Sequence, residues 1–176
     1  MKKVIALGGS NSKNSINKAL AIYAAQQVKN TETVVIDLND FDLPIYGIDE
    51  ETTNGIPADA TRLNDIIASA DALVVSLAEH NGCYSVAFKN AYDWMSRIDK
   101  KVWKDTPMLL MATSPGGRGG ATVLGIAKAG FPYLGGNIVA DFSLPSFHSN
   151  FSTDGLKDDT LDADLNAKIQ LLQNAM

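Results

Sequence analysis

Short runs of apolar residues alternate along the chain with segments in which apolar residues recur every three or four positions. A continuous apolar run is typical of a strand that is buried on both faces of a sheet. Each run here ends at a glycine or at a group of polar residues, which bounds a strand. The runs predict strands at residues 4–7, 33–36, 72–77, 108–112 and 137–140.

The segments between the runs have the apolar spacing of helices. Apolar residues three and four positions apart lie on one helical face, which can pack on a sheet. Residues 39–54 lack this spacing and contain Pro44 and Gly47, so we expect an irregular segment there. The periodic segments predict helices at residues 16–28, 57–69, 87–98, 121–134 and 161–172.

Strands that alternate with helices indicate a parallel sheet with helices on both faces. Five strands are too few for the eight-stranded barrel and fit a doubly wound sheet with the order 2-1-3-4-5. We therefore predict an α/β fold with three layers, flavodoxin-like in strand order. No linker, repeat or low-complexity tract divides the chain, so residues 1–176 are predicted to form a single domain.

Composition narrows the possible functions. The single cysteine, Cys83, excludes an intrachain disulfide framework and a cysteine-rich zinc site. The net charge of −5 disfavours general nucleic-acid binding, which requires a basic surface. Most of this charge comes from residues 154–164, so an anion site elsewhere faces no strong repulsive field.

The lengths of the apolar runs also indicate the cellular compartment. None approaches the roughly 20 residues that span a bilayer. The run that follows Lys3 stops at Gly8, so it is too short for a signal peptide. We expect a cytoplasmic protein whose partners are neither membranes nor nucleic acids.

The most unusual loops follow the first, third and fourth predicted strands. In the order 2-1-3-4-5 these strands are neighbours, so their carboxyl ends lie side by side, where ligands bind in such sheets. The first loop, residues 9–17, contains three serines and three asparagines before a helix. One such residue could simply cap the helix, and Asn14 or Ser15 is suited to that. The abundance of hydroxyl and amide donors favours a phosphate site instead.

The second loop, residues 78–85, contains His80 and Cys83. Two residues are too few for a metal site, and nothing in the sequence completes a catalytic triad around Cys83. We therefore expect a small packed or half-exposed thiol. In the helix that follows, Lys89 and Asp93 are spaced for a surface ion pair. The aromatic residues of that helix are expected in the core or at a subunit interface: Phe88, Tyr92 and Trp94.

The third loop, residues 114–120, has four glycines among its last five residues. It could be a flexible surface turn. Its place at the end of a central strand favours a loop that faces a ligand, because glycines let a flat or bulky group approach the backbone. A phosphate cradle without paired carboxylates, a triad or a metal cluster indicates that a cofactor supplies the chemistry. We thus assign no catalytic side chain and no metal ligand.

The three loops resemble the motifs of the NADPH-dependent FMN reductase family. The family motif G-S-x-R-x-x-S-x-N is similar to the segment from Gly9 to Asn17. The motif P-E-Y-N-G, followed by x-K-N-A-x-D-W, resembles residues 78–82 and 89–94. Residues 114–120 resemble S-x-G-G-x-G-G, and residues 42–46 resemble D-L-P-x-Y. The resemblance extends over about residues 4–140.

The resemblance implies that the chain binds FMN and uses NADPH or NADH as electron donor. Hydride would pass to the flavin and then, in a ping-pong cycle, to a small-molecule acceptor such as free flavin or a quinone. It also implies a homodimer or homotetramer. Its motifs place the phosphate on Ser10, Ser15 and Asn17. The cofactor-binding residues that it implies are Ser10, Ser12, Ser15, Ile16, Asn17, Ala78, Glu79, His80, Asn81, Gly82, Ser114, Pro115, Gly116 and Gly117.

The chain departs from these motifs at three positions. Ser12 stands at the arginine position, which removes a charge-assisted contact to the phosphate. We expect weaker FMN binding than in a relative with arginine, unless Lys13 substitutes. Ala78 and His80 stand at the proline and tyrosine positions, and an imidazole stacks less and titrates near neutral pH. We expect these changes to alter acceptor preference. The alternative function is an FMN-binding electron carrier without NAD(P)H oxidation.

Overall fold

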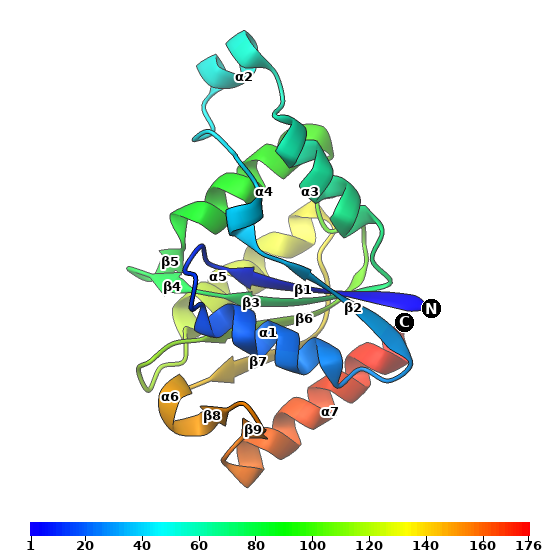
Figure 1. The fold of residues 1–176 in the computed structure, drawn as a ribbon, viewed down its shortest axis with the longest axis vertical. Helices are drawn as coiled ribbons and strands as arrows, with labels where there is room; N and C mark the ends of the chain where they lie inside the picture. Colours follow the sequence, from blue (N-terminus) through cyan, green and yellow to red (C-terminus); the bar gives the residue numbers. More distant parts are fainter.

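A five-stranded parallel sheet forms the centre of the molecule (Figure 1). The computed structural model describes all residues from Met1 to Met176. The strand order is β2-β1-β3-β6-β7, so the predicted order 2-1-3-4-5 is confirmed once the short hairpin strands are left out. These strands are β1 (Lys2–Gly9), β2 (Thr31–Ile36), β3 (Ala72–Leu77), β6 (Pro107–Thr113) and β7 (Asn137–Leu144).

The register of the central strands aligns their carboxyl ends. Gly9 at the end of β1 pairs with Leu77 at the end of β3, and Leu77 pairs with Ala112 near the end of β6. The three loops singled out in the sequence therefore leave the sheet side by side at one edge.

Helices cover both faces of the sheet. Helices α1 (Ile16–Gln26) and α7 (Asp159–Ala175) pack on one face, and α3 (Ala58–Ala68), α4 (Val86–Ile98) and α5 (Ala121–Gly130) pack on the other. Alternate residues of each strand enter opposite cores, as the twofold period of a strand requires. In β3, Leu73 and Val75 enter the core under α4, whereas Val74 enters the core under α1. This is why the strand sequences are continuously apolar.

The aromatic residues of α4 lie in the core. Phe88 and Trp94 are fully buried, and Tyr92 is nearly so. Phe88 and Tyr92 form an aromatic cluster with Trp103 and Phe131, whose ring centroids are 4.6 Å apart. The core interpretation of these residues is confirmed for this chain.

The prediction of an irregular segment at residues 39–54 is confirmed for residues 41–47 and wrong at both ends of the segment. A 3-10 helix, η1 (Leu38–Asp40), and helix α2 (Ile48–Asn54) form there, and α2 projects from the body of the molecule (Figure 1). Helix α2 has no buried residue, so no apolar periodicity marks it in the sequence. Its Glu51 connects it to α4 by accepting from Arg97 at 2.9 Å. The segment before α2 contacts the same helix, where the rings of Tyr46 and Trp94 lie nearly perpendicular with centroids 5.1 Å apart.

The remaining elements are short. They comprise the hairpin β4 (Glu79–His80) and β5 (Cys83–Tyr84), the 3-10 helix η2 (Phe131–Leu134), helix α6 (Phe147–Asn150) and the hairpin β8 (Phe151–Ser152) and β9 (Gly155–Leu156). None of the helices has the length and apolar character needed to cross a bilayer.

Candidate functional site

The loops after β1, β3 and β6 surround a small cavity of about 170 Å³ at the carboxyl edge of the sheet. Segments far apart in the sequence therefore meet at one place, as predicted. Most of the expected cofactor-binding residues line it, whereas Asn81, Gly82, Gly116 and Gly117 do not. The residues that line the small cavity are Ser10, Ser12, Asn14, Ser15, Ile16, Asn17, Ala78, Glu79, His80, Thr113, Ser114 and Pro115.

The first loop supplies neutral hydrogen-bond donors to the small cavity. Ser15 caps α1, since its Oγ accepts from the backbone N–H of Lys18 at 3.1 Å. The Oγ of Ser10 accepts from the N–H of Ser12 at 3.1 Å. The hydroxyl hydrogens of these serines have no acceptor within the protein. The first N–H groups of α1 also lack carbonyl partners, as in any helix. The cap and the phosphate interpretations are therefore compatible, because capping uses only the oxygen of Ser15.

No lysine or arginine lines the small cavity. Lys18, in the first turns of α1, forms an ion pair with Asp37 after β2. Burial on its own raises the pKa of the Asp37 carboxyl, but hydrogen bonds from Lys18 and Asn39 outweigh it and hold the pKa below the ordinary value of 3.8. Lys13 lines a neighbouring cavity of about 330 Å³, which shares Asn14, Ser15 and Ile16 with the small cavity. The donors that line the small cavity itself are therefore hydroxyl, amide and imidazole groups rather than lysine or arginine side chains.

The second loop forms a short β-hairpin with a two-residue turn. Asn81 and Gly82 have φ angles of 52° and 75° and connect β4 to β5. Positive φ at both central residues is the type I′ turn, for which Asn-Gly is the preferred sequence. His80 and Cys83 face each other across this hairpin, and Cys83 is exposed. The Asn-Gly pair was the sequence signal for this hairpin, and our prediction of a loop overlooked it.

Glu79 connects the second loop to the helix after the third loop. Its Oε2 accepts from the backbone N–H groups of Thr122 at 2.9 Å and Val123 at 3.0 Å. Gly120 precedes α5 and offers no side-chain cap, so the Glu79 carboxylate satisfies these first-turn donors. The hairpin is thereby fixed beside the glycine loop, and Glu79 is a structural residue at the rim of the small cavity.

The glycines of the third loop serve different purposes. Gly119 and Gly120 have φ angles of 57° and 74°, and a Cβ on either would lie within 3 Å of neighbouring atoms, so the fold requires glycine there. Gly116 and Gly117 have no positive φ, and a Cβ on either would meet nothing closer than 3.9 Å. The fold does not need glycine at these two positions, and their open surroundings suit the approach of a ligand.

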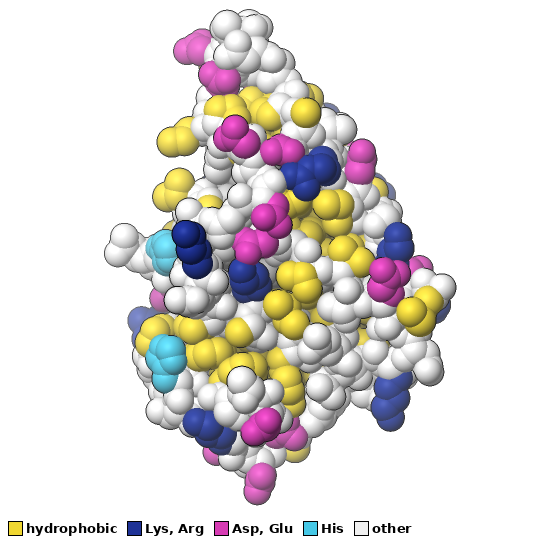
Figure 2. All heavy atoms as spheres, viewed as in Figure 1, with side chains coloured by type: hydrophobic (Ala, Val, Ile, Leu, Met, Phe, Trp, Pro, Cys, Tyr) yellow, Lys and Arg dark blue, Asp and Glu magenta, His cyan; other side chains and the backbone are white.

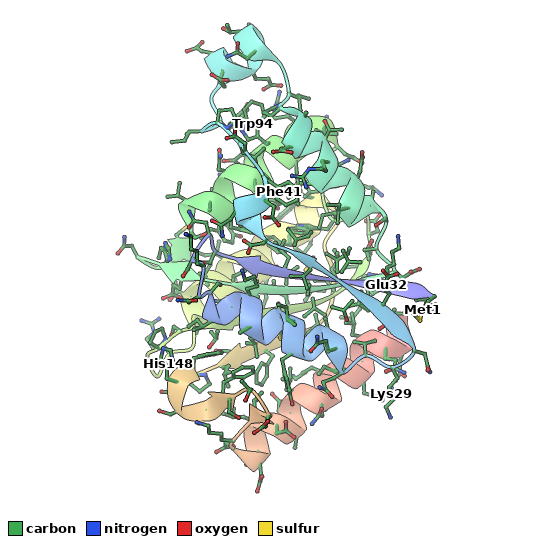
Figure 3. The ribbon with its side chains drawn as sticks, viewed as in Figure 1. Met1, Lys29, Glu32, Phe41, Trp94 and His148 are labelled. Atoms are coloured by element: carbon green, nitrogen blue, oxygen red, sulfur yellow. The ribbon has the colours of Figure 1, made fainter.

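A larger cavity of about 400 Å³ adjoins the small one at His80, the one residue that lines both. Phe41, which Figure 3 labels beside η1, is part of its apolar wall. The Asn90 amide is used internally, accepting from Tyr46 N–H at 2.8 Å and donating to Pro44 O at 3.0 Å. No charged side chain lines this cavity. Its lining comprises Asn11, Leu38, Asn39, Phe41, Leu43, His80, Val86, Ala87, Asn90 and Ala91.

Several lining residues were not predicted from the sequence. Thr113 and Asn14 line the small cavity, and Asn11 lines the large one. Thr113 lies between the predicted strand at residues 108–112 and the third loop, and only its hydrogen bonds to Asn17 of α1 reveal its place at the site. Asn11 and Asn14 belong to the polar loop that we had already singled out, and that composition was the available signal.

Other titratable groups nearby are not suited to proton transfer. Burial raises the pKa of both Tyr84 and Tyr92, which keeps these phenols neutral. Lys89 and Asp93 form the predicted surface pair on α4, with Nζ and Oδ1 2.7 Å apart. No three histidine, cysteine, aspartate or glutamate side chains gather as a metal site would require. On the face shown in Figure 2, positive and negative side chains are interspersed.

Comparison with known proteins identifies the family of the chain. The sequence profile of the NADPH-dependent FMN reductase family matches residues 2–149. A quinone reductase of Escherichia coli K12 is 31% identical over 119 residues, which cover 68% of this chain. The match spans 63% of that reductase, so it does not extend over the whole relative.

Solved structures share the fold over nearly the entire chain. The flavoenzyme NAD(P)H:acceptor oxidoreductase FerB of Paracoccus denitrificans superposes with a TM-score of 0.77 at 26% identity, covering 99% of this chain and 96% of FerB. A flavodoxin of Pseudomonas aeruginosa superposes with a TM-score of 0.56 at 17% identity, covering 99% of this chain and 98% of the flavodoxin. The second likeness shows that the fold is flavodoxin-like.

Proposed function

The chain belongs to the NADPH-dependent FMN reductase family, and from this premise we propose that it is an NAD(P)H-dependent flavoprotein reductase. FMN bound at the carboxyl edge of the sheet would accept hydride from NADPH or NADH and pass electrons to a small acceptor in a ping-pong cycle. The residues present fit this cofactor, because hydroxyl and amide donors cluster in the small cavity beside an open glycine loop.

We assign the phosphate of FMN to the small cavity. The hydroxyls of Ser10, Ser12 and Ser15 and the first N–H groups of α1 are the donors directed to it. The flavin ring would extend from there toward the turn at Asn81–Gly82 and the open glycines Gly116 and Gly117. Glu79 and His80 would form the wall between the two loops, with Ala78, Ile16, Ser114 and Pro115 completing the site.

The single observation that favours an enzyme over an electron carrier is the pair of adjoining cavities. A carrier that exchanges electrons with proteins needs one cofactor site and a docking face. An enzyme that reduces a small molecule needs a second cavity next to the first. The large cavity meets the small one at His80 and has no charged lining, so we propose that an uncharged acceptor occupies it. Quinones have this chemistry, and a quinone reductase is among the relatives.

The proposal is tested with the purified protein. We expect it to be yellow, or to become yellow when FMN is added, and NADPH or NADH to bleach the flavin without oxygen. Addition of a quinone should then restore the colour. A yellow protein that neither nicotinamide bleaches would support the carrier function instead. A colourless protein in the presence of excess FMN would contradict both flavin functions.

We further propose a cytoplasmic homodimer or homotetramer. Exposed apolar side chains gather near α2 and the start of α4, where Ile45, Ile48 and Val86 are each more than half exposed. Exposed apolar patches of this kind mark interaction surfaces. Light scattering coupled to size-exclusion chromatography would contradict this proposal if the holoprotein eluted with the mass of one chain.

A further inference from the structure

Asn17 differs from the other polar residues of the first loop because it is buried and already bonded. Only 2% of its surface is exposed, although it is the second residue of α1. Its Oδ1 accepts from the Thr113 backbone N–H at 3.1 Å and from the Ser76 hydroxyl at 2.7 Å. Its Nδ2 donates to the Thr113 carbonyl oxygen at 3.2 Å. Three of its four hydrogen-bonding positions are therefore used within the protein.

These bonds connect the helix to the sheet at the site itself. The Asn17 amide pairs with both backbone groups of Thr113, as a neighbouring strand would, at the carboxyl end of β6. Ser76 lies at the carboxyl end of β3. Thr113 Oγ1 donates to Leu144 O of β7 at 2.7 Å, so the network reaches across the sheet. One side chain thus links α1 to the strands that carry the second and third loops.

The residue that Asn17 holds is the base of the glycine loop. Ser114 follows Thr113, and its carbonyl oxygen accepts from Phe147 N–H at 3.0 Å. The Gly116 carbonyl oxygen accepts from Ser146 N–H at 2.9 Å. One end of the loop is therefore anchored by Asn17 and its outer part by residues 146 and 147. The Asn17 amide is thus a direct hydrogen-bonded link between the helix that follows the serine loop and the base of the glycine loop.

We propose that Asn17 is a positioning residue for the entire flavin, and that it does not act mainly as a ligand of the phosphate. This inference rests on the proposed flavin function. Its physical basis is that buried amides with satisfied partners hold backbone segments in register, whereas the loss of one partner leaves polar groups unpaired. If the two loops move apart, contacts to both the phosphate and the ring weaken together.

Riboflavin, which lacks the phosphate, separates the two roles. In Asn17→Ala we expect the affinities for FMN and riboflavin to fall by a similar factor, about tenfold or more, as measured by quenching of flavin fluorescence. Ser12→Ala is the matched control for a phosphate ligand, because its hydroxyl has no partner within the protein. That variant should lose affinity for FMN and keep its affinity for riboflavin.

Ser76→Ala controls for stability alone. It removes one buried hydrogen bond to Asn17 but leaves the paired bonds to Thr113, so both flavins should bind as in the wild type although the protein unfolds at lower urea. If Asn17→Ala does not fold, Asn17→Ser is the second variant: it adds no charge beside the phosphate and keeps a hydroxyl, but its side chain is too short to pair with both backbone groups of Thr113. In either variant the visible circular dichroism of bound flavin should change, because the ring meets a displaced glycine loop.

The inference is overturned if substitution of Asn17 weakens FMN binding and spares riboflavin, which would make it a phosphate ligand. It is also overturned if both flavins bind normally with an unchanged dichroism spectrum while stability falls. If the wild-type protein binds neither flavin, the proposed function itself is wrong. If the wild type binds FMN, and substitution of Asn17 weakens the binding of FMN but not of riboflavin, the proposed function stands and only the positioning role of Asn17 is wrong.

Discussion

The residue at position 12 determines whether an arginine lines the small cavity. Ser12 lines this cavity, and no lysine or arginine does so. Lys13 is exposed and lines only the neighbouring cavity, and Lys18 is paired with Asp37. A neutral hydrogen bond to a phosphate is roughly half as strong as one from a guanidinium. The weaker FMN binding expected from the sequence thus has a structural reason.

Ser12→Arg should therefore increase the affinity for FMN by about tenfold and leave riboflavin unaffected, since only the phosphate gains a charge-assisted bond. Fluorescence titration at low and at moderate salt measures the affinities for FMN and for riboflavin. Gln170→Arg adds the same charge at an exposed position of α7 and should change neither affinity. An unchanged FMN affinity in Ser12→Arg would count against the phosphate assignment.

Gly117 tests whether the open part of the glycine loop faces the flavin. A Cβ there meets nothing within 4 Å and the backbone needs no glycine, so Gly117→Ala should leave the free energy of unfolding unchanged. The added methyl group should weaken FMN binding by about tenfold, because overpacking a contact costs about 1–3 kcal/mol. Gly47→Ala is a matched control, with equally open surroundings outside the site. Equal FMN affinities in the wild type, Gly117→Ala and Gly47→Ala would contradict the proposal that this loop contacts the flavin.

At the scale of elements, distant side chains hold the loops in place. Glu79 of the hairpin caps α5, and Asp37 after β2 pairs with Lys18 of α1. The second contact fixes the first turns of α1, whose N-terminus borders the small cavity. Both contacts join elements that no local sequence pattern relates, and both lie at the carboxyl edge of the sheet.

The ion pair of Asp37 predicts a specific dependence on pH. Its pKa in the folded protein is below 3.8, so its contribution to stability is complete above the unfolded pKa and is lost as the pH falls through the folded pKa. As the pH falls from about 5 through the folded pKa, the free energy of unfolding of the wild type should decrease more steeply than that of Asp37→Asn. Urea unfolding at a series of pH values measures this difference.

Asp154→Asn provides the control, because Asp154 is exposed and its carboxylate has no partner. Its stability curve should follow that of the wild type throughout the acid range. Parallel curves for Asp37→Asn and the wild type would show that the pair with Lys18 contributes nothing to acid sensitivity.

At the scale of the whole molecule, the proposed enzyme depends on two cavities that meet at His80. Ala87 on α4 lines the large cavity. Ala87→Leu would fill part of it with a residue that favours the helix, so the fold is retained. We expect the apparent KM for an uncharged quinone to rise by about tenfold, while the rate of anaerobic bleaching by NAD(P)H stays the same.

Ala68→Leu places the same side chain at the exposed end of α3 and should leave both measurements unchanged. If Ala87→Leu reduces bleaching by the nicotinamide and spares the quinone, the large cavity would receive the donor rather than the acceptor. Stopped-flow measurement of flavin reduction by the nicotinamide and of flavin reoxidation by the quinone distinguishes these two assignments of the large cavity.

The sequence by itself determined the five strands of the central sheet, their order and the three loops of the site. Strands buried on both faces must be continuously apolar, and that pattern is readable without knowledge of any partner. The strand order followed from the number of strands and the alternation with helices. The loops stood out because serines, asparagines and glycines in such density are unusual at the ends of buried strands. The family resemblance rested on these same loops.

Only the tertiary structure decided how the site is held together. Asn17 faces inward to Thr113, 96 positions away, and Glu79 caps a helix 43 positions away. The projecting α2 and the large cavity likewise depend on segments brought together by packing. Side-chain direction and distant pairing are set by the assembled sheet and its helices, because hydrogen bonds and packing act through space and leave no periodic trace along the chain.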